Sequence, residues 1–505
     1  MLKSNPASLP ATDMTQPWPF DNSYAALPEA FYSRLHPTPV KAPGPIRVNR
    51  ALAEELGLDA DWLASAEGTQ VLAGNTVPEG AAPLAAIYAG HQFGSFNPRL
   101  GDGRAILLGE VISRAGDRFD IQLKGSGPTP YSRGGDGRAP LGPVLREYIV
   151  SEAMHTLGVP TSRSLAAVTT GETVYRERPL PGAVLTRVAH SHIRIGTVEF
   201  FAAQRDTQAL QQLVEHVINR HYPAAAQAAV PALALLEAVM GSQATLVAQW
   251  MLLGFIHGVM NTDNMLLSGE TIDYGPCAFM DQFRPDTVFS SIDHHGRYAW
   301  HKQPGIAHWN LAVLARSLLP LLHQDQQEAM QLAQTAVDTF PDRFQTAYQA
   351  GLNRKLGWSG YREGDRELGT ELFALMAAEE VDFTLCFRAL ADFANPAGSA
   401  PGAAELFSLP AAFLPWMRRW QARCEQDDLA AGKRQALMYR ANPVFIARNH
   451  LVEEAIAAAV ETSDFAPFHS LLETLAQPFH YRPELRRHAL PPTPDQVVQQ
   501  TFCGT

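Results

Sequence analysis

Three oxygen-bearing side chains lie close together in the segment His257–Gly275, which has the sequence HGVMNTDNMLLSGETIDYG. Asn264 and Asp273 offer the hard oxygen ligands that a divalent cation bound to triphosphate takes from a protein. Asp263, directly before Asn264, is placed to accept the proton of an incoming hydroxyl. We expect a hairpin over NMLL-SG-ETID to bring Asn264 and Asp273 together. An Asn- and Asp-rich turn, with Asp273 as a cap, is the purely structural alternative.

The order of these residues is typical of kinase-like phosphotransferases, which carry H-R-D-x-x-x-x-N followed by D-F-G. His257 and Asn264 keep the kinase spacing, and Asp273-Tyr274-Gly275 stands where D-F-G would stand. However, Val259 occupies the position of the kinase catalytic aspartate and cannot accept a proton. The sequence therefore predicts a nucleotide enzyme whose chemistry differs from that of an ordinary kinase.

Lys124 is a candidate for contact with phosphate. It ends the strand-like run QLKG before a Gly-Ser-Gly turn, as the strand lysine of kinases does above a nucleotide. Such a lysine is usually held by a helix carboxylate, and Glu147 and Glu152 are both candidates. An exposed lysine beside an ordinary surface glutamate is the commoner origin of this pattern.

Two Gly-Asp-Gly-Arg runs flank the Lys124 strand, at Gly101–Arg104 and Gly135–Arg138. Glycine lets backbone amides approach phosphate closely, which favours a nucleotide cradle, although Asp-Gly is also a strong hairpin-turn signal. Arg187 and Arg194 carry guanidinium groups that bind phosphate oxygens bidentately, but their spacing alone fits surface arginines better.

The remaining histidines of interest are interpreted as structural. His190 and His192 have no third metal ligand nearby in the sequence. His91, in the compact peptide YAGHQFG, is expected to be a buried, hydrogen-bonded side chain in a turn, and we assign this peptide no chemistry.

The elements that must position these residues change in type along the chain. Residues 49–58 are predicted to form a short helix capped by Asn49. Residues 105–112 and 118–125 are predicted to form two antiparallel strands joined by a tight turn. Apolar residues recur every four positions in LREYIVSEAMHTLG (residues 145–158), which predicts a helix. SLAAVTTG and GAVLTRVA are strand-like, and the chain becomes helical from about residue 232.

Composition limits the class of protein. The 505 residues carry a net charge of −11, with 46% hydrophobic and 18% charged residues, which is typical of a soluble globular protein. The acidic balance argues against general binding to nucleic acid or anionic membranes. We find no run of about 20 apolar residues and no signal-peptide core, so we expect a cytoplasmic protein. The cysteines form no C-x-x-C motif or zinc-like cluster; they are Cys277, Cys386, Cys424 and Cys503.

Taken together, these motifs resemble the selenoprotein O family of kinase-like protein adenylyltransferases. The matching peptides run from about residue 88 to 460: YAGHQFGSFNPRLGDGRA, IQLKGSGPTPYSRGGDGRA, LREYIVSEAMHTLGVPTSRSL, RVAHSHIRIGTVEFF, HGVMNTDNM, TIDYGP and NPVFIARNHLVEEAI. The resemblance implies an α+β, kinase-like two-lobed fold. We expect an N-terminal extension over 1–85, a strand-rich N-lobe over 86–185, and an enlarged helical C-lobe over 186–505 that contains the catalytic loop 257–275.

The resemblance also implies a chemistry in which ATP binds in a flipped orientation and AMP is transferred to Ser, Thr or Tyr hydroxyls of proteins, including the enzyme itself. Attack at the α-phosphorus requires the α-phosphate at the metal and base, with the β- and γ-phosphates in a basic pocket. Each residue follows from its motif. The implied roles are proton acceptor for Asp263, Mg²⁺ or Mn²⁺ ligands for Asn264 and Asp273, phosphate contact for Lys124 paired with Glu147, triphosphate binding for Arg187 and Arg194, and nucleotide lining for Gly101, Gly103, Arg104, Asp136 and Gly137.

Two other functions compete with this interpretation. A true phosphotransferase could use Asp263 in place of the acid missing at Val259. A catalytically dead nucleotide-binding scaffold would bind ATP or a partner without turnover. The joint retention of four residues speaks against it: Lys124, Asp263, Asn264 and Asp273. Some members of the resembled family end near a selenocysteine, and a redox link between Cys277 and Cys503 is a further hypothesis.

Overall fold

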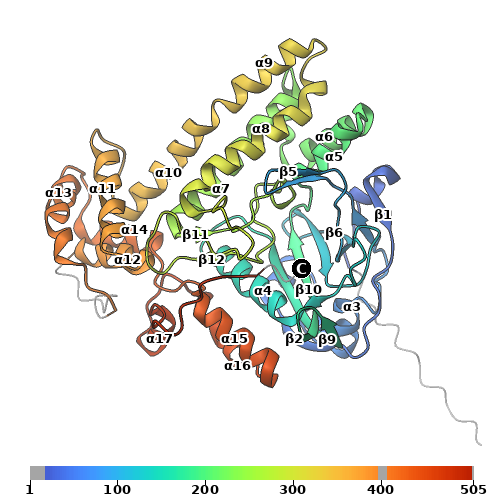
Figure 1. Cartoon of the computed structure of the whole chain (residues 1–505), viewed down its shortest axis with the longest axis horizontal. Helices are drawn as coiled ribbons and strands as arrows, with labels where there is room; N and C mark the ends of the chain where they lie inside the picture. Colours follow the sequence, from blue (N-terminus) through green and yellow to red (C-terminus); the bar gives the residue numbers. More distant parts are fainter. Residues whose placement is uncertain (1–17, 396–405, 503–505) are drawn as a thin grey trace, which may run out of the picture.

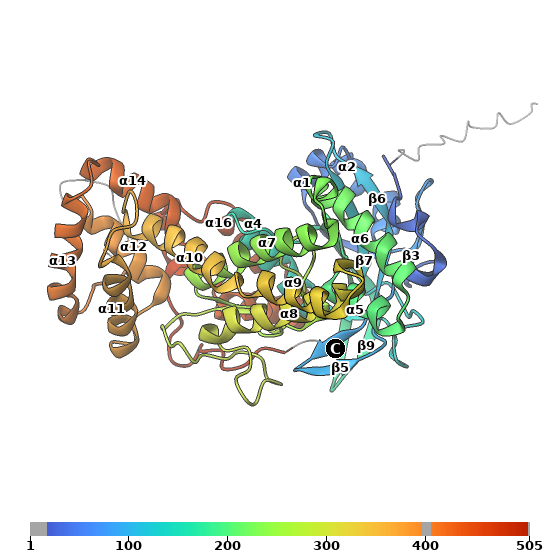
Figure 2. The same cartoon turned by 90° about the horizontal axis from the view of Figure 1, so that it is seen from above.

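The computed structural model describes residues 18–395 and 406–502 and shows a mixed α/β structure (Figure 1). An antiparallel sheet lies toward one end of the molecule, and helices make up most of the remainder, as Figure 2 shows from above. All strands of the main sheet precede residue 190 in the sequence. The predicted change from strand-rich to helical structure along the chain is therefore confirmed.

The main sheet has the strand order β1-β3-β6-β7-β10-β9-β2, and the short β8 pairs with β10. Lys124 ends β7 and is in register with Ala105 on β6 and Leu185 on β10, so it lies at the end of a central strand. The strands that were predicted from the sequence are present. The bounds are β1 Tyr32–Arg34, β2 Gly44–Val48, β3 Leu84–Ala86, β6 Ala105–Ile112, β7 Arg118–Lys124, β8 Ala139–Pro140, β9 Arg163–Tyr175 and β10 Pro179–Ala189.

Residues before position 86 contribute both strands and helices to this region. β1 and β2 form the two edges of the sheet. The helix predicted at Asn49 is confirmed, and the Asn49 side chain accepts a hydrogen bond from Leu52 N at 3.2 Å. One face of the sheet, with Leu123 and Val184, shares a buried core with the first three helices. These are α1 Arg50–Glu55, α2 Ala60–Leu63 and α3 Ala66–Leu72.

The opposite face of the sheet packs against α4 (Leu141–Thr156), which is the helix predicted from four-residue spacing. Leu145 and Ile149 on α4 and Leu185 on β10 are fully buried in the same hydrophobic cluster. Two helices from the end of the chain, α15 (Asn449–Thr462) and α16 (Ala466–Leu475), also contact α4. The helix that faces the sheet is thus held by elements three hundred residues away in sequence.

The remaining helices make up the part of the molecule beyond the sheet. Among them, α11 to α14 lie at the end farthest from the sheet (Figure 2). They are α5 Ile195–Gln204, α6 Thr207–His221, α7 Pro231–Leu253, α8 Gln303–Leu322, α9 Gln326–Val337, α10 Phe340–Leu356, α11 Asp365–Ala378, α12 Phe383–Phe393, α13 Leu414–Glu425, α14 Ala431–Ala441 and α17 Arg486–Ala489.

The hairpin predicted between Asn264 and Asp273 is wrong. Leu266 forms an antiparallel bridge with Arg194, and Thr271 forms a parallel bridge with Thr161. Because the backbone groups of Leu266 and Thr271 pair with segments outside this stretch, residues 264–273 form a loop rather than a strand pair. Two small strand pairs lie beside it: β4 Gly90–Gln92 with β5 Ser95–Asn97, and β11 Phe255–Ile256 with β12 Ala278–Phe279.

Among the residues that the structure describes, two helical stretches are long and apolar enough to cross a membrane by length and composition, namely Pro231–Leu253 and Trp300–Leu322. Within the structure, 56% and 50% of their most apolar windows are buried, and α7 packs against α8 and α10. Core helices of soluble proteins have these properties, so the two stretches are consistent with a soluble protein.

Lys355 near the end of α10 is an unusual member of the helical core. Only 4% of the residue is exposed, and its ammonium lies 4.2 Å from the centre of the Phe387 ring and 5.9 Å from that of Phe383. Burial lowers the pKa of Lys355 to about 7, against a weak opposing effect of Cys386. The side chain is therefore held in a site that disfavours its charged form.

We predict that Lys355 makes stability depend on pH between about 7 and its unfolded pKa. In that range the unfolded chain binds the proton that the folded chain has lost, so the free energy of unfolding should rise with pH. The slope should approach about 1.4 kcal/mol per pH unit relative to a Lys355→Met variant. Urea denaturation of both proteins at pH 7, 8, 9 and 10 measures this difference, and parallel pH curves would contradict it.

Candidate active site

Three cationic side chains converge on the carboxylate of Asp273. Its Oδ1 lies 3.0 Å from Lys124 Nζ and 2.8 Å from Arg187 Nη2, and its Oδ2 lies 3.7 Å from Arg194 Nη2. Burial raises the pKa of Asp273, but the positive charges of Lys124, Arg187 and Arg194 outweigh it and hold the pKa well below its usual range. The carboxylate is thus ionised and is a quarter exposed, which leaves it accessible to a ligand.

The backbone at Asp273 is also strained, because its φ is +63°, in the left-handed region that non-glycine residues rarely occupy. Thr271, two residues earlier, is fixed by its bridge to Thr161. His257 Nε2 donates to Ile272 O at 2.8 Å, directly before Asp273. The surrounding contacts therefore hold the carboxylate in a conformation that the isolated chain would avoid.

Glu147 is the second anion of this cluster. Its Oε2 accepts from Lys124 Nζ at 2.6 Å, and its Oε1 accepts from Arg187 Nε at 2.7 Å. Burial raises the pKa of Glu147, but Arg187 and Lys124 outweigh burial and lower it. The other candidate, Glu152, binds Arg163 instead, so of the two glutamates on α4 only Glu147 contacts the lysine.

Arg194 is buried and oriented by a separate set of groups. Its Nη1 lies 3.1 Å from Asp102 Oδ1, and its guanidinium lies over the Tyr88 ring at 4.3 Å from the ring centre. Asp102 also accepts from Gln122 Nε2 at 3.3 Å. Neither Asp102 nor Tyr88 was singled out from the sequence, although Asp102 is the aspartate of the first Gly-Asp-Gly-Arg run.

The two Gly-Asp-Gly-Arg runs pack against the segment that follows Lys124. A Cβ on Gly101 would lie 2.5 Å from the Tyr131 ring, and one on Gly103 would lie 2.8 Å from Tyr131 O. Arg104 O accepts a backbone hydrogen bond from Gly125 N at 2.7 Å. The close packing against Tyr131 explains the glycines of the first run. The contact of this run with nucleotide stays a prediction.

The second run has a similar packing reason. Gly137 has a φ of +64°, and a Cβ there would overlap the backbone of Gly127 at 2.1 Å. Asp136 lies at the surface, where it pairs with Arg176 at 2.9 Å, and the hydrogen bonds from Arg176 lower its pKa. The predicted nucleotide contact of Asp136 and Gly137 also stays a prediction.

Asp263 lies in a short 3-10 turn, Thr262–Asn264, and is 8% exposed. Its Oδ2 accepts from Gln92 Nε2 at 3.0 Å, whereas its buried Oδ1 has no hydrogen-bond partner within the part of the chain that the structure describes. Burial raises the pKa of Asp263 to about 6, and the Gln92 hydrogen bond offsets part of this effect. A carboxylate with a raised pKa and an uncommitted oxygen is suited to accept a proton.

The β4–β5 hairpin holds this turn in place, a role that the sequence did not suggest. His91 N donates to Thr262 Oγ1 at 2.7 Å, and Phe93 N donates to Asn261 Oδ1 at 3.1 Å. The His91 ring is buried and paired with Glu199, as predicted for a satisfied histidine. The compactness of YAGHQFG was the available signal, but no spacing rule links it to a loop 171 residues later.

His257 positions the loop rather than taking part in chemistry. It is fully buried; its Nδ1 accepts from Val259 N at 3.3 Å, and burial lowers its pKa. Val259, in place of a kinase aspartate, is also buried. The histidine therefore ties the start of the loop to Ile272 and so to Asp273.

The donor set fits a hard divalent cation shared with phosphate. Asn264 Nδ2 donates to Val259 O at 3.0 Å, which leaves its amide oxygen as the group that can face a cation. Asp273 supplies a charged oxygen donor. No group of three or more His, Cys, Asp or Glu side chains forms a metal site within 18–395 and 406–502, but Mg²⁺ at nucleotide sites takes only one or two protein carboxylates and completes its shell with phosphates and water.

The other histidines are structural in geometry. His190 pairs with Glu270 at 2.9 Å, and His192 pairs with Asp120 at 3.0 Å. His190 is half exposed and His192 is buried. Because His190 and His192 pair with different carboxylates, the two rings do not share a common metal position.

The segment after Asp273 is anchored by the end of the chain. Arg146 on α4 donates to Cys277 O at 3.1 Å and to Asn449 Oδ1 at 2.8 Å. Thr501 Oγ1 donates to Pro276 O at 2.6 Å. Cys503 lies outside the described residues, so its predicted link to Cys277 stays a prediction.

Comparisons with known proteins agree along nearly the whole chain. The profile of a family described as "Protein adenylyltransferase SelO" matches residues 16–476. A "Protein nucleotidyltransferase YdiU" of Rhodopseudomonas palustris (strain BisB5) is 59% identical over 492 residues, which cover 97% of this chain and 100% of that protein. Proteins of the same name from Bradyrhizobium diazoefficiens and Methylorubrum extorquens (strain PA1) are each 58% identical, with the same coverage of both chains.

Arg448 provides a test of how firmly the segment after Asp273 is anchored. The side chain is fully buried and contacts Asp281 of that segment and, at 2.8 Å, Asp382 Oδ2. We predict that Arg448→Ala lowers the free energy of unfolding by about 3–5 kcal/mol, because it leaves two carboxylates without a cation. The exposed pair Arg419–Glu371 is the control, where Arg419→Ala should change stability by about 1 kcal/mol or less. Equal effects in urea denaturation would contradict the anchoring role.

Proposed function

The chain belongs to the SelO family of protein adenylyltransferases, and from that premise we propose which residues of this nucleotidyltransferase carry the reaction. ATP is bound in a flipped orientation and AMP is transferred to Ser, Thr or Tyr hydroxyls of proteins, including copies of the enzyme. The single observation that supports this most is the contrast between two aspartates. Asp273 is ionised among three cations, whereas Asp263 is buried with an uncommitted oxygen and a raised pKa.

In the proposed step the acceptor hydroxyl oxygen attacks the α-phosphorus of ATP. A new bond forms between that oxygen and the α-phosphorus, and the bond from the α-phosphorus to the bridging oxygen of the β-phosphate breaks. Pyrophosphate leaves, and the hydroxyl proton passes to Asp263. The Asp263 pKa of about 6 suits this role, since most of the carboxyl is ionised at neutral pH yet retains some basicity.

The cations around Asp273 support the flipped orientation. Lys124, Arg187 and Arg194 come from β7, β10 and the start of α5, and the latter two are almost fully buried. We propose that these side chains bind the β- and γ-phosphates and stabilise the charge of departing pyrophosphate. Glu147 keeps Lys124 and Arg187 in position, since it contacts both.

Asn264 and Asp273 are the residues that would hold Mg²⁺ or Mn²⁺. Such an ion neutralises phosphate charge where the reaction takes place. In the structure Asp273 pairs with Lys124, Arg187 and Arg194. With Asp273 as a ligand of the ion, the triphosphate would supply anions for those three cations. Gly101, Gly103, Arg104, Asp136 and Gly137 remain the proposed nucleotide-lining residues.

The fold proposed for this activity is kinase-like and two-lobed. The sheet with α4 corresponds to the N-lobe and the helices from α7 onward to the C-lobe. The proposed boundaries are 1–85, 86–185 and 186–505. The sheet crosses two of them, because β1, β2 and the start of β3 precede residue 86 and β10 ends at residue 189. A cytoplasmic location, protein acceptors and the absence of nucleic-acid and membrane partners are part of the same proposal.

A label-transfer assay tests the reaction directly. Protein, a generic acceptor and Mg²⁺ or Mn²⁺ are incubated with ATP labelled at either the α- or the γ-phosphate, and the adduct mass is read in parallel. We expect label from the α-position only, and its loss in Asp273→Ala and Lys124→Ala. Transfer from the γ-position would identify a kinase, and bound ATP without transfer would identify a scaffold.

The Val259→Asp variant separates the flipped from the ordinary orientation. It restores the carboxylate that kinases carry at this position of the loop. If the γ-phosphate lies away from the loop, the variant should not gain γ-transfer in the same assay. A clear gain of γ-label on the acceptor would contradict the flipped orientation.

Gly90→Ala tests the placement of Asp263 without changing its chemistry. A Cβ on Gly90 would lie 2.6 Å from Asp263 Oδ1, so the carboxylate must move. Because a displacement of about 1 Å can lower catalysis by 10²-fold, we expect kcat for α-label transfer to fall by about that factor while the Kd for ATP is retained. Gly360→Ala is the matched control, since nothing lies within 4 Å of a Cβ there. Unchanged kcat in Gly90→Ala would contradict the assignment.

A further inference from the structure

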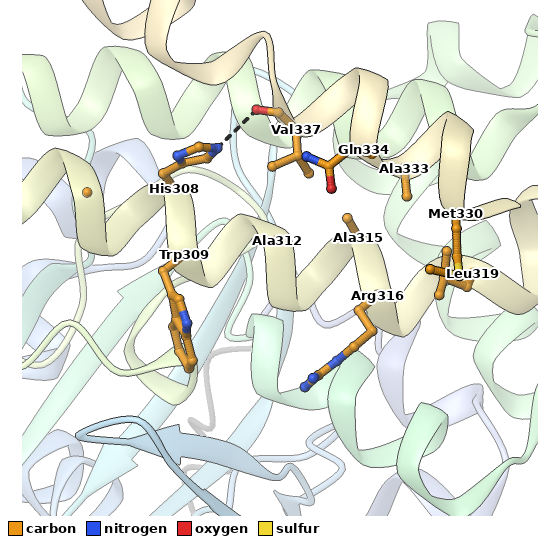
Figure 3. A pocket seen from close by; sticks show the side chains of 11 residues that line it. His308, Trp309, Ala312, Ala315, Arg316, Leu319, Met330, Ala333, Gln334 and Val337 are labelled. Carbon is orange, nitrogen blue, oxygen red and sulfur yellow. Dashed lines mark hydrogen bonds between the residues drawn. The ribbon is translucent and has the colours of Figure 1, made fainter. Parts of the chain in front are cut away.

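An open groove of about 480 Å³ lies between α8 and α9 (Figure 3). Its walls are mainly apolar, with Ala312, Ala315 and Leu319 from α8 and Met330 and Ala333 from α9. Trp309 and Arg316 lie seven residues apart and leave α8 on the same side, as Figure 3 shows. The groove is separate from the cluster around Asp273, whose residues do not line it.

The groove begins beside the proposed base. The ring of Trp309 lies 5.2 Å from that of His91, between ring centres, and the adjacent residue Gln92 donates to Asp263 at 3.0 Å. Phe96 on β5 also contacts His91, at 5.0 Å between ring centres. A chain bound over Trp309 would therefore lie beside His91 on β4, and the next residue of β4, Gln92, contacts Asp263.

Large apolar side chains are exposed along this path. Met330 is 55% exposed, Phe96 is 43% exposed and Trp309 is 36% exposed. Isolated exposed apolar residues need no explanation. Here Met330 and Trp309 line one groove, and Phe96 lies on the neighbouring hairpin against His91, which is typical of an interaction surface.

The charge of the groove favours an acidic partner. Its lining contains Arg316 and His308 and no carboxylate, although the chain as a whole carries a net charge of −11. Arg316 is exposed, and within the described ranges its side chain makes no hydrogen bond or ion pair. A second guanidinium, that of Arg297, lies 5.1 Å from the centre of the Trp309 ring.

Building on the proposed function, we propose that this groove docks the acceptor protein. The occupant is an extended segment with an apolar residue over Trp309 and an acidic residue at Arg316, and its hydroxyl reaches Asp263. Seven helical residues rise roughly 10 Å, which about three residues of extended chain span. If the residue over Trp309 lies one or two positions from the modified hydroxyl, the acidic residue is about four or five positions from that hydroxyl.

The experiment uses the full-length enzyme and synthetic peptides. One set carries a single central Ser, Thr or Tyr, a neighbouring Leu, and Glu at positions three to six on both sides. The second set has Lys in place of Glu. Values of kcat/KM for α-label transfer are measured for wild type and for the Arg316→Glu, Trp309→Ala and Arg366→Glu variants, together with the Kd for ATP.

We expect the wild type to favour the Glu peptides. Arg316→Glu should lower kcat/KM for them by about fivefold or more and raise it for the Lys peptides, because one charge pair becomes repulsive and the other attractive. Trp309→Ala should weaken both sets. Arg366→Glu on the exposed face of α11 is the matched control and should change neither set. The Kd for ATP should be unchanged in all variants.

The outcomes separate this inference from the function on which it rests. A wild type that binds ATP but labels no acceptor from the α-position overturns the proposed function. A wild type that labels both peptide sets equally, with no effect of Arg316→Glu, overturns the groove alone. Sedimentation of the same proteins tests a second copy of this chain as the occupant. A dimer that Trp309→Ala converts to monomer would assign the groove to self-association and overturn acceptor docking.

Discussion

The sharing of the Asp273 carboxylate by three cations is the interaction on which the rest of this structure depends. At separations of 2.8–3.0 Å each close pair is worth roughly 5 to 6 kcal/mol at an effective dielectric constant of about 20. Taking each ion out of water costs several kcal/mol, so the cluster contributes little net stability. Its physical consequence is geometric. An ion pair this buried tolerates few arrangements, and it requires β7, β10, α4 and the loop at Asp273 to meet at one point.

Much of the outer structure keeps those elements in place. Arg146 is adjacent to Glu147 on α4 and reaches both the segment after Asp273 and the start of α15. On the other side, Arg194 is oriented by Asp102 and Tyr88 from the first third of the chain. The charged cluster is therefore coupled to both ends of the sequence. Loss of any one of these contacts would leave the three cations less firmly positioned. Binding of a triphosphate would require those cations in fixed positions.

Local patterns in the sequence predicted most of what is local in the structure. The strands at 105–112 and 118–125 and the helix that carries Glu147 follow from residue periodicity, and Lys124 and Glu147 do form a pair. The hairpin expected between Asn264 and Asp273 failed because its backbone groups bridge Arg194 and Thr161, which are distant in sequence. The same limit applies to Gln92. Its contact with Asp263 joins residues 171 positions apart, and no periodicity or motif spacing encodes such a pairing.

The two aspartates divide the site into sides that can be occupied independently. On one side, the three cations that suit phosphate surround Asp273, and they come from β7, β10 and the start of α5. On the other side, Asp263 faces the β4–β5 hairpin, beyond which lie Trp309 and the α8–α9 groove. Both carboxylates lie on one loop that the hydrogen bonds of His257 fix. In the proposed reaction the nucleotide would bind on the first side and the acceptor hydroxyl would approach from the second. In the proposed in-line attack the acceptor would enter opposite the departing pyrophosphate, and the separation of a cationic side from an apolar, aromatic side supports that proposal.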